Sequence, residues 1–350
     1  MVRSFTGAAA VLAALALAAC GGDDGGSGDK SGGASGGGGG GAKKVAYSNP
    51  VAGQPGQEEL MLGFTGGAKE LGWKATQINA NLSPDKQVAD IATMISQKQD
   101  GIASWTLDPG AAAGAYGQAR SAGIPVIGVN SEGEGVSTSV WWELNTCEND
   151  PPIGRTAKMI AESRPKAKVI MIGGPPVPSI KAYEDCFAKE AKAAGLQVVA
   201  KVANTKDTAA TAQPLTADVL TKHPDADAIW AYNDQSALGA SAAVTSASKK
   251  VSDGKSDGIM VFGQNGDEDA ITAIKDGRLT ATWDTDAIGT GWAVIKALTY
   301  YIGDAKTDNP PKNLVVKSTM WTKDNVGEYV PPRQRKYTVE TAPLLDQAGQ

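Results

Sequence analysis

The sequence predicts an α/β fold made of two doubly wound, parallel-sheet lobes. Short, continuous apolar runs alternate with amphipathic stretches of ten or more residues, a pattern typical of buried parallel strands connected by right-handed helical crossovers. Glycine marks the passage from helix to strand at Gly72, Gly123 and Gly195, where the left-handed conformation carries no Cβ penalty. The alternation restarts near residues 145–150, and about 300 residues are too many for one typical domain. We therefore expect two lobes of the same architecture.

In the first lobe, each expected strand is followed by a helix. The strands are expected at 44–48, 73–78, 101–105 and 125–129, and the helices at 58–71, 85–97 and 111–122. A further stretch, 136–144, precedes the restart.

The second lobe repeats the pattern. Its strands are expected at 168–172, 196–203, 228–232, 258–263 and 280–283, and its helices at 153–163, 180–194, 208–222, from 235 onward, 267–276 and 288–302.

The chain begins with the pattern of a secretory signal. Arg3 precedes an uncharged stretch from Ser4 to Ala19 that ends in Leu17-Ala18-Ala19-Cys20, and its apolar part is too short to span a bilayer. We interpret residues 1–20 as a lipoprotein signal peptide with a lipobox, with Cys20 lipidated after cleavage; the alternative is an ordinary signal without a lipid. Residues 21–42 are rich in Gly and Ser, with no apolar surface to bury, and are expected to be a flexible tether. The expected location is extracytoplasmic, anchored to the cell membrane through Cys20.

Composition excludes several classes of function. The net charge of −5 offers no basic stripe for nucleic acid. His223 is the only histidine, so the sequence contains neither a plausible zinc site nor a Ser-His-Asp arrangement, and we expect no metal and no cofactor.

Cys147 and Cys186 are the two cysteines besides Cys20. A lone pair of cysteines in an exported chain favours a disulfide, with two separate thiols as the alternative.

Polar side chains follow many of the expected strands, where parallel sheets bind ligands. Amides offer both hydrogen-bond donors and acceptors and an indole covers C–H surface, so this set suits an uncharged, polyhydroxylated ligand. Taken one at a time, these residue types are also ordinary turn formers. The candidates are Gln54, Gln57, Trp105, Asp108, Asn130, Ser131, Asn233, Asn265 and Asp284.

Several segments resemble the ribose-binding-protein-like solute receptors, which are type I periplasmic binding proteins. The segments are Ala68–Gly72, Ser83–Gln87, Ser121–Val126, His223–Ile229, Tyr232–Ala240 and Ala273–Thr282. The resemblance implies a three-crossing hinge between lobes that close on a sugar and present it to an ABC permease. It divides the chain into residues 43–145 plus 285–312 and residues 146–284 plus 313–340.

The resemblance also implies roles for individual residues. Asn233 falls where the family has an asparagine that binds sugar hydroxyls, and we expect its amide to complete its hydrogen bonds only with ligand. Tyr183 stands in place of a family arginine, Asn130-Ser131 in place of Asp-Arg, and Gln264-Asn265 in place of Phe-Asp. Because two arginines and a carboxylate are lost, D-ribose itself is disfavoured.

The predicted function is that of a monomeric, non-enzymatic binding protein that delivers a sugar, polyol or cyclitol to an importer. An extracytoplasmic sensor that presents its closed form to a membrane kinase is the alternative. An enzyme would need an acid and a base in one cleft, and Asp108 with Asp284 is the only carboxylate couple worth considering. Whether Trp141 and Trp142 line the cleft or pack the hinge is left open.

Overall fold

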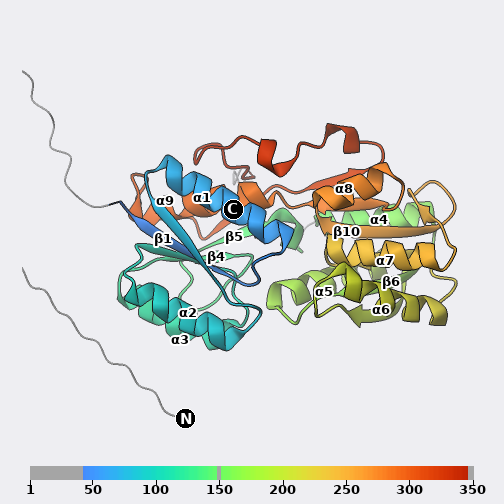
Figure 1. Cartoon of the computed structure of the whole chain (residues 1–350), viewed down its shortest axis with the longest axis horizontal. Coiled ribbons are helices and arrows are strands. Elements are labelled where there is room, and N and C mark those ends of the chain that lie inside the picture. The colour runs from blue at the N-terminus through green and yellow to red at the C-terminus, as the bar shows by residue number, and fades with distance from the viewer. Residues whose placement is uncertain (1–41, 148–150, 346–350) are drawn as a thin grey trace, which may run out of the picture. The chain divides into compact units, whose positions relative to one another are not determined.

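The computed structural model describes residues 42–147 and 151–345. The predicted signal peptide, Cys20 and nearly all of the predicted tether lie outside this range. The described residues form two α/β lobes, and helices cover the sheet of each lobe (Figure 1). This confirms the predicted fold class. None of the described helices is both long enough and apolar enough to cross a membrane.

The first lobe is built on a sheet of six parallel strands in the order β12-β5-β4-β3-β1-β2. The strands are β1 (Lys44–Asn49), β2 (Lys74–Asn79), β3 (Gly101–Ser104), β4 (Val126–Val129), β5 (Thr138–Trp142) and β12 (Asn313–Val316).

Helices cover both faces of this sheet. They are α1 (Pro55–Glu70), α2 (Pro84–Ser96), α3 (Pro109–Ser121) and α9 (Ala287–Ile302). Helices α1 and α9 pack on one face and α2 and α3 on the other (Figure 1). The approach of α1 to α9 requires glycine, because a Cβ at Gly63 would lie 1.9 Å from the carbonyl oxygen of Ile288.

The second lobe has a main sheet in the order β13-β11-β10-β8-β6-β7, with β9 paired to β10. The strands are β6 (Lys168–Gly173), β7 (Gln197–Ala203), β8 (Ala228–Ala231), β9 (Val251–Ser252), β10 (Ile259–Asn265), β11 (Ala281–Asp284) and β13 (Thr319–Thr322). The helices are α4 (Pro152–Ser163), α5 (Pro178–Ala193), α6 (Ala209–Lys222), α7 (Asp234–Ser246) and α8 (Glu268–Lys275). Strand β13 runs antiparallel to β11, an exception that the all-parallel prediction did not include.

The chain passes between the two sheets three times before the end of β13, and the third passage lies later in the chain than the expected boundary at residue 312. Residues from 313 onward were assigned to the second lobe, whereas β12 pairs with β5 in the first sheet, with Leu314 beside Val140. Val316 is fully buried there. The chain therefore crosses between Val316 and Thr319, not at residue 312.

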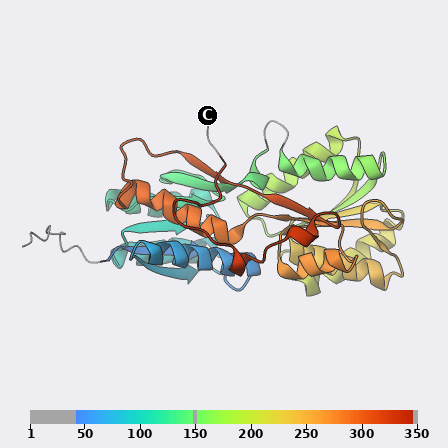
Figure 2. The same cartoon turned by 90° about the horizontal axis from the view of Figure 1, so that it is seen from above.

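A fourth crossing follows, made by the C-terminal strap, which we define as residues 330–345. Just before the strap, Val326 packs in a hydrophobic core of the second lobe. Val339 and Ala342 are buried in the core of the first lobe, and Leu344 forms a β-bridge with Val316. Figure 2 shows this red segment returning to the first lobe. The prediction that residues through 340 belong to the second lobe is therefore wrong for the strap.

A disulfide joins Cys147, after the first crossing, to Cys186 of α5, with Cα atoms 5.8 Å apart. The bond closes a loop across a sequence separation of 39 residues. By loop-closure entropy, such a crosslink stabilises the folded state by roughly 4 kcal/mol. We expect reduction to lower the urea midpoint of unfolding and mass spectrometry of a non-reduced digest to recover the linked peptides. An unchanged midpoint on reduction, or two free thiols in exported protein, would contradict this prediction.

Candidate ligand-binding site

A cavity lies where the carboxyl ends of strands from both lobes meet. The space between its lining atoms, open solvent at the mouth included, is about 800 Å³, of which about 100 Å³ can hold the centre of a water-sized sphere. Residues that follow β1, β3, β7 and β8, together with the last residues of β10, form much of its wall. This is the edge at which open parallel sheets bind ligands.

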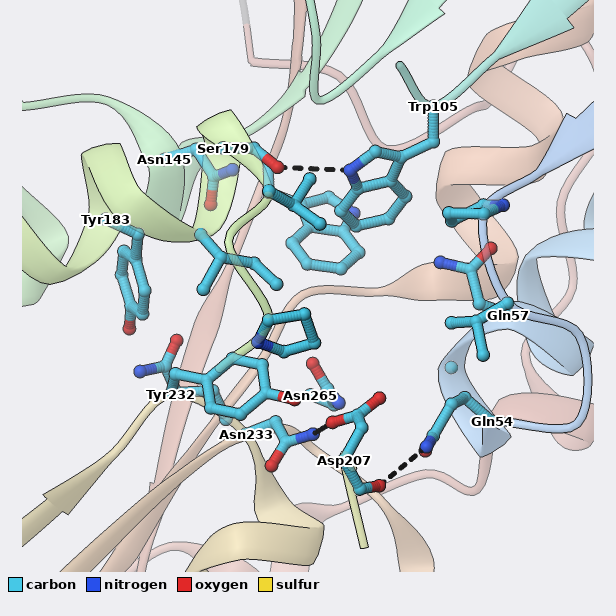
Figure 3. Close-up of a pocket in the computed structure, with 18 of the residues that line it drawn as sticks. Gln54, Gln57, Trp105, Asn145, Ser179, Tyr183, Asp207, Tyr232, Asn233 and Asn265 are labelled. Carbon is cyan, nitrogen blue, oxygen red and sulfur yellow. Dashed lines mark hydrogen bonds between the residues drawn. The ribbon is translucent and has the colours of Figure 1, made fainter. Parts of the chain in front are cut away.

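Six of the ten residues predicted to bind ligand line the cavity. They are Gln54, Gln57, Trp105, Tyr183, Asn233 and Asn265. They come from both lobes (Figure 3).

The other four predicted residues have structural roles away from the cavity. Asp108 is exposed and caps α3, where its side chain accepts a hydrogen bond from the Ala111 N–H. Asn130 adopts a left-handed conformation, and its Oδ1 accepts a hydrogen bond from the Trp142 N–H at 2.7 Å. The Ser131 hydroxyl donates to the Ser104 carbonyl oxygen at 3.1 Å. The turn-former interpretation therefore applies to these residues.

Asp284 is bonded to β13 and to the strap. Its carboxylate accepts hydrogen bonds from Arg335, from the Trp321 indole at 3.0 Å and from the Asp286 N–H at 2.8 Å. Both oxygens are engaged, and the side chain lines a different hollow, beneath the strap. Asp108, the other member of the carboxylate couple considered for an enzyme, lines neither this hollow nor the cavity between the lobes.

Asn233 lines the cavity, but its amide is bonded within the protein. Its Oδ1 caps α7 by accepting from the Ser236 N–H at 2.9 Å, and its Nδ2 donates to Asp207 Oδ1 at 2.6 Å. The expectation that this amide completes its bonds only with ligand is therefore wrong. Asn233 instead holds Asp207.

Asp207 is the only carboxylate among the described residues that line the cavity. It follows β7, and its backbone is left-handed with φ of 59°. Burial raises the pKa of Asp207 to about 7, while the hydrogen bond from Asn233 opposes the rise. The group therefore changes its charge near neutral pH.

Gln57 is oriented by a buried tyrosine. The Tyr47 hydroxyl donates to Gln57 Oε1 at 2.8 Å, which fixes the amide so that Nε2 points into the cavity (Figure 3). This nitrogen is a donor ready for a ligand oxygen.

Tyr232 adds a hydroxyl with no hydrogen-bond partner. Its side chain is buried and lines the cavity. Gly174 makes room for the ring, since a Cβ there would lie 2.5 Å from the ring carbons. A buried hydroxyl without a partner destabilises the empty protein, and a hydrogen bond to a ligand would remove that cost.

Two hydrogen bonds join the lobes across the cavity. Gln54 Nε2 of the first lobe donates to the Asp207 carbonyl oxygen at 2.7 Å, and Trp105 Nε1 donates to Ser179 Oγ of the second lobe at 3.1 Å (Figure 3). The two lobes thus touch around the cavity.

Sequence reasoning missed more than half of the lining. The missed residues are Pro50, Val51, Leu82, Asn145, Pro175, Val177, Ser179, Ile180, Asp207 and Tyr232. Tyr232 carries the same signal as the residues that were found, a polar or aromatic side chain directly after a strand, whereas Asp207 lies in the loop between β7 and α6. Trp142, whose role was left open, lines the cavity and also packs against the cores of both lobes.

The described lining contains no lysine, arginine or histidine. One carboxylate, several amides and aromatic hydroxyls supply its polarity. Such a wall can exchange hydrogen bonds with hydroxyl groups but has no cation with which to pair an anionic ligand.

Comparisons with known proteins agree with this architecture. A ribose import binding protein of Bacillus subtilis is 30% identical over 226 residues, covering 64% of this chain and 70% of that protein. Among solved structures, the Caulobacter myo-inositol binding protein bound to myo-inositol aligns with a TM-score of 0.72 at 22% identity, covering 83% of this chain and 97% of that one. A solute binding protein from Burkholderia graminis in complex with D-arabinose aligns with a TM-score of 0.73 at 20% identity, covering 83% of this chain and 98% of that one. These two likenesses show the shared fold.

Residues 45–306 match the periplasmic binding protein domain. This match spans most of the described body and both lobes. The chain belongs to the periplasmic binding protein family.

Proposed function

We propose that this chain is the lipid-anchored substrate-binding protein of an ABC importer and that it binds one neutral, polyhydroxylated small molecule between its lobes. The observation that carries the proposal is the cavity wall: both lobes contribute hydrogen-bonding side chains to it, and its described lining residues include no lysine, arginine or histidine. The names of the similar proteins support it, since ribose, myo-inositol and D-arabinose are all polyhydroxylated. The anchor at Cys20 is proposed from the lipobox alone.

Ligand binding is proposed to favour the closed arrangement. Gln57 of the first lobe and Asp207 with Tyr232 of the second can bind one ligand together only when the lobes meet. A ligand that shifts a receptor from about 1% to about 99% closed must favour the closed state by about 5.5 kcal/mol. Four or five net hydrogen bonds of about 1 kcal/mol each, with one aromatic contact, supply that preference.

A thermal-shift screen tests the proposal. The body from Ala42 to Gln350, exported without the lipid so that the disulfide can form, is melted with pentoses, hexoses, polyols and cyclitols. A specific binder raises the melting temperature in proportion to RT ln(1 + [L]/Kd). Stabilisation by an amino acid or an aromatic acid, with none by any hydroxylated compound, would overturn it.

Asp207 gives the proposed binding a pH dependence. The ionised carboxylate accepts stronger hydrogen bonds from ligand hydroxyls than the protonated group does, and its pKa in the empty protein is about 7. As the pH falls through 7, binding must compete with protonation, so we expect affinity for a neutral ligand to fall by roughly fivefold between pH 8 and pH 6.

Asp207→Asn serves as the control, because it removes the titration and keeps the shape. This variant should bind more weakly at pH 8 and show a flat profile in calorimetric titrations. An equally steep profile in the variant would show that another group, not Asp207, carries the dependence.

A further inference from the structure

The two ends of the cavity differ in chemistry. At one end the side chains of Gln54, Asp207, Asn233 and Asn265 gather, and Trp105 lies at the other (Figure 3). The Trp105 end is continuous with the hydrophobic core of the first lobe. The apolar lining residues that belong to this core or pack against it are Leu82, Trp105, Trp142, Val177 and Ile180.

The two tryptophans present ring surface and no free N–H. Trp105 Nε1 donates to Ser179, and Trp142 Nε1 donates to Thr290 Oγ1 at 3.0 Å. The rings meet edge to face with centroids 5.0 Å apart. A ligand hydroxyl against this surface would lose its water without gaining a hydrogen bond from either indole, which is unfavourable.

Two polar side chains, Asn145 and Ser179, stand on the Trp105 side of the cavity (Figure 3). The Ser179 oxygen already accepts the bond from Trp105. Ser179 keeps its O–H as a donor and Asn145 offers its amide, so this side can bind a linking heteroatom of a ligand beside the apolar surface.

Unused polar atoms lie at the polar end and between the two ends, where Figure 3 places Gln57 between Trp105 and Gln54. Gln57 Nε2 points into the cavity, and the Tyr232 hydroxyl has no partner. Asp207 Oδ1 accepts from Asn233, which leaves lone pairs on its second carboxylate oxygen for ligand hydroxyls.

We infer that the ligand is amphiphilic: a hydroxylated ring that carries an apolar alkyl, alkylthio or deoxy-methyl substituent. The hydroxyls bind Gln57, Asp207 and Tyr232, and the substituent packs against Trp105, Trp142 and Ile180. This inference rests on the proposed function and narrows it from polyols in general to polyols with one apolar end.

Matched pairs of compounds test the inference on the unchanged chain. The pairs are D-ribose with 5-deoxy-D-ribose, D-allose with 6-deoxy-D-allose, and a series of 5-alkylthio-D-riboses of increasing chain length, each measured by calorimetric titration. Within the series we expect roughly fourfold tighter binding for each added methylene until the apolar end is filled. Tighter binding of every fully hydroxylated parent than of its deoxy or alkylthio partners would overturn the inference and leave the proposed function standing. Failure of all parents and partners to bind would overturn both.

Ile180→Thr places a hydroxyl at the apolar end. We expect it to reduce the preference for the alkylthio compound over D-ribose by about tenfold, whereas Val330→Thr, at an exposed valine outside this cavity, leaves the preference unchanged. Melting curves confirm that both variants fold. An unchanged preference in a folded Ile180→Thr protein would place the substituent elsewhere and overturn the inference; the matched pairs decide the question if the variant does not fold.

Discussion

Arg335→Met is expected to lower the free energy of unfolding by about 3–5 kcal/mol, because it leaves two buried carboxylates without their cation. The Arg335 side chain is 10% exposed, and it pairs with Asp284 and Asp286, which are 6% and 12% exposed. Tyr337, also in the strap, donates its hydroxyl to Asp286. This ionic cluster fastens the C-terminal strap to the junction between β11 and α9.

The matched control is Arg278→Met, which removes a surface ion pair. Arg278 and Asp276 are both about half exposed, and such pairs contribute about 0–1 kcal/mol. Urea unfolding of both variants beside the unchanged chain measures the difference. Equally small losses in the free energy of unfolding of the two variants would show that Arg335 does not fasten the strap to the junction between β11 and α9.

The loss in Arg335→Met should grow with pH. Burial raises the pKa values of Asp286 and of Glu59, the latter to about 8, and Arg335 opposes both rises. A carboxyl whose pKa is higher in the folded state than in the unfolded state, where it is near 4, favours folding most at a pH below 4. That contribution is lost as the pH rises through the pKa of the folded state. Without Arg335 the pKa values of Asp286 and Glu59 rise further, so the variant is expected to be more strongly destabilised at pH 8 than at pH 5. A loss independent of pH would contradict this coupling.

Asn233→Ala is expected to lower both stability and affinity. It removes the cap of α7, which contributes about 1 kcal/mol, and it leaves buried Asp207 without its donor, at a further cost of about 1–3 kcal/mol. Because Asp207 is then free to turn away from the ligand, we expect affinity for a hydroxylated ligand to fall at least about tenfold. Thermal melts without ligand and titrations with it measure the two effects.

Two further variants separate the cap from the cavity. Asn233→Ser retains a capping oxygen and removes the amide that holds Asp207, so affinity should fall while stability falls less than in Asn233→Ala. Asp108→Ala removes the cap of α3 outside the cavity, and should cost about 1 kcal/mol with affinity unchanged. Normal affinity in both Asn233 variants would mean that Asp207 does not bind ligand.

The helices and most strands could be predicted because their signals are local. Apolar runs, helix periodicity and helix-ending glycines lie within short windows of the chain. Strand β12 shows where local signals fail. Its apolar residues fit either sheet, and only pairing with β5, about 170 residues away in the sequence, assigns it to the first lobe.

The candidate site was predicted less completely than the fold, for the same reason. Asp108 and Asn233 both follow strands and both cap helices, so residue type cannot tell which of them faces a cavity. Asp284 also lies at a strand end, but its partner Arg335 comes from the strap, 51 residues later in the sequence. Whether a residue at a strand end lines the cavity or bonds elsewhere in the protein is therefore decided by long-range packing.

One ligand is proposed to be held by both lobes at once. Calorimetric titration of the exported body with the tightest compound from the matched pairs tests it most directly, using one variant in each lobe. Gln57→Glu in the first lobe keeps an acceptor for Tyr47 and removes the donor that points into the cavity; Asp207→Asn in the second lobe removes the carboxylate. We expect one site per chain in the unchanged protein and at least about fivefold weaker binding at pH 8 in each variant. Full affinity in either folded variant would contradict a site shared between the lobes.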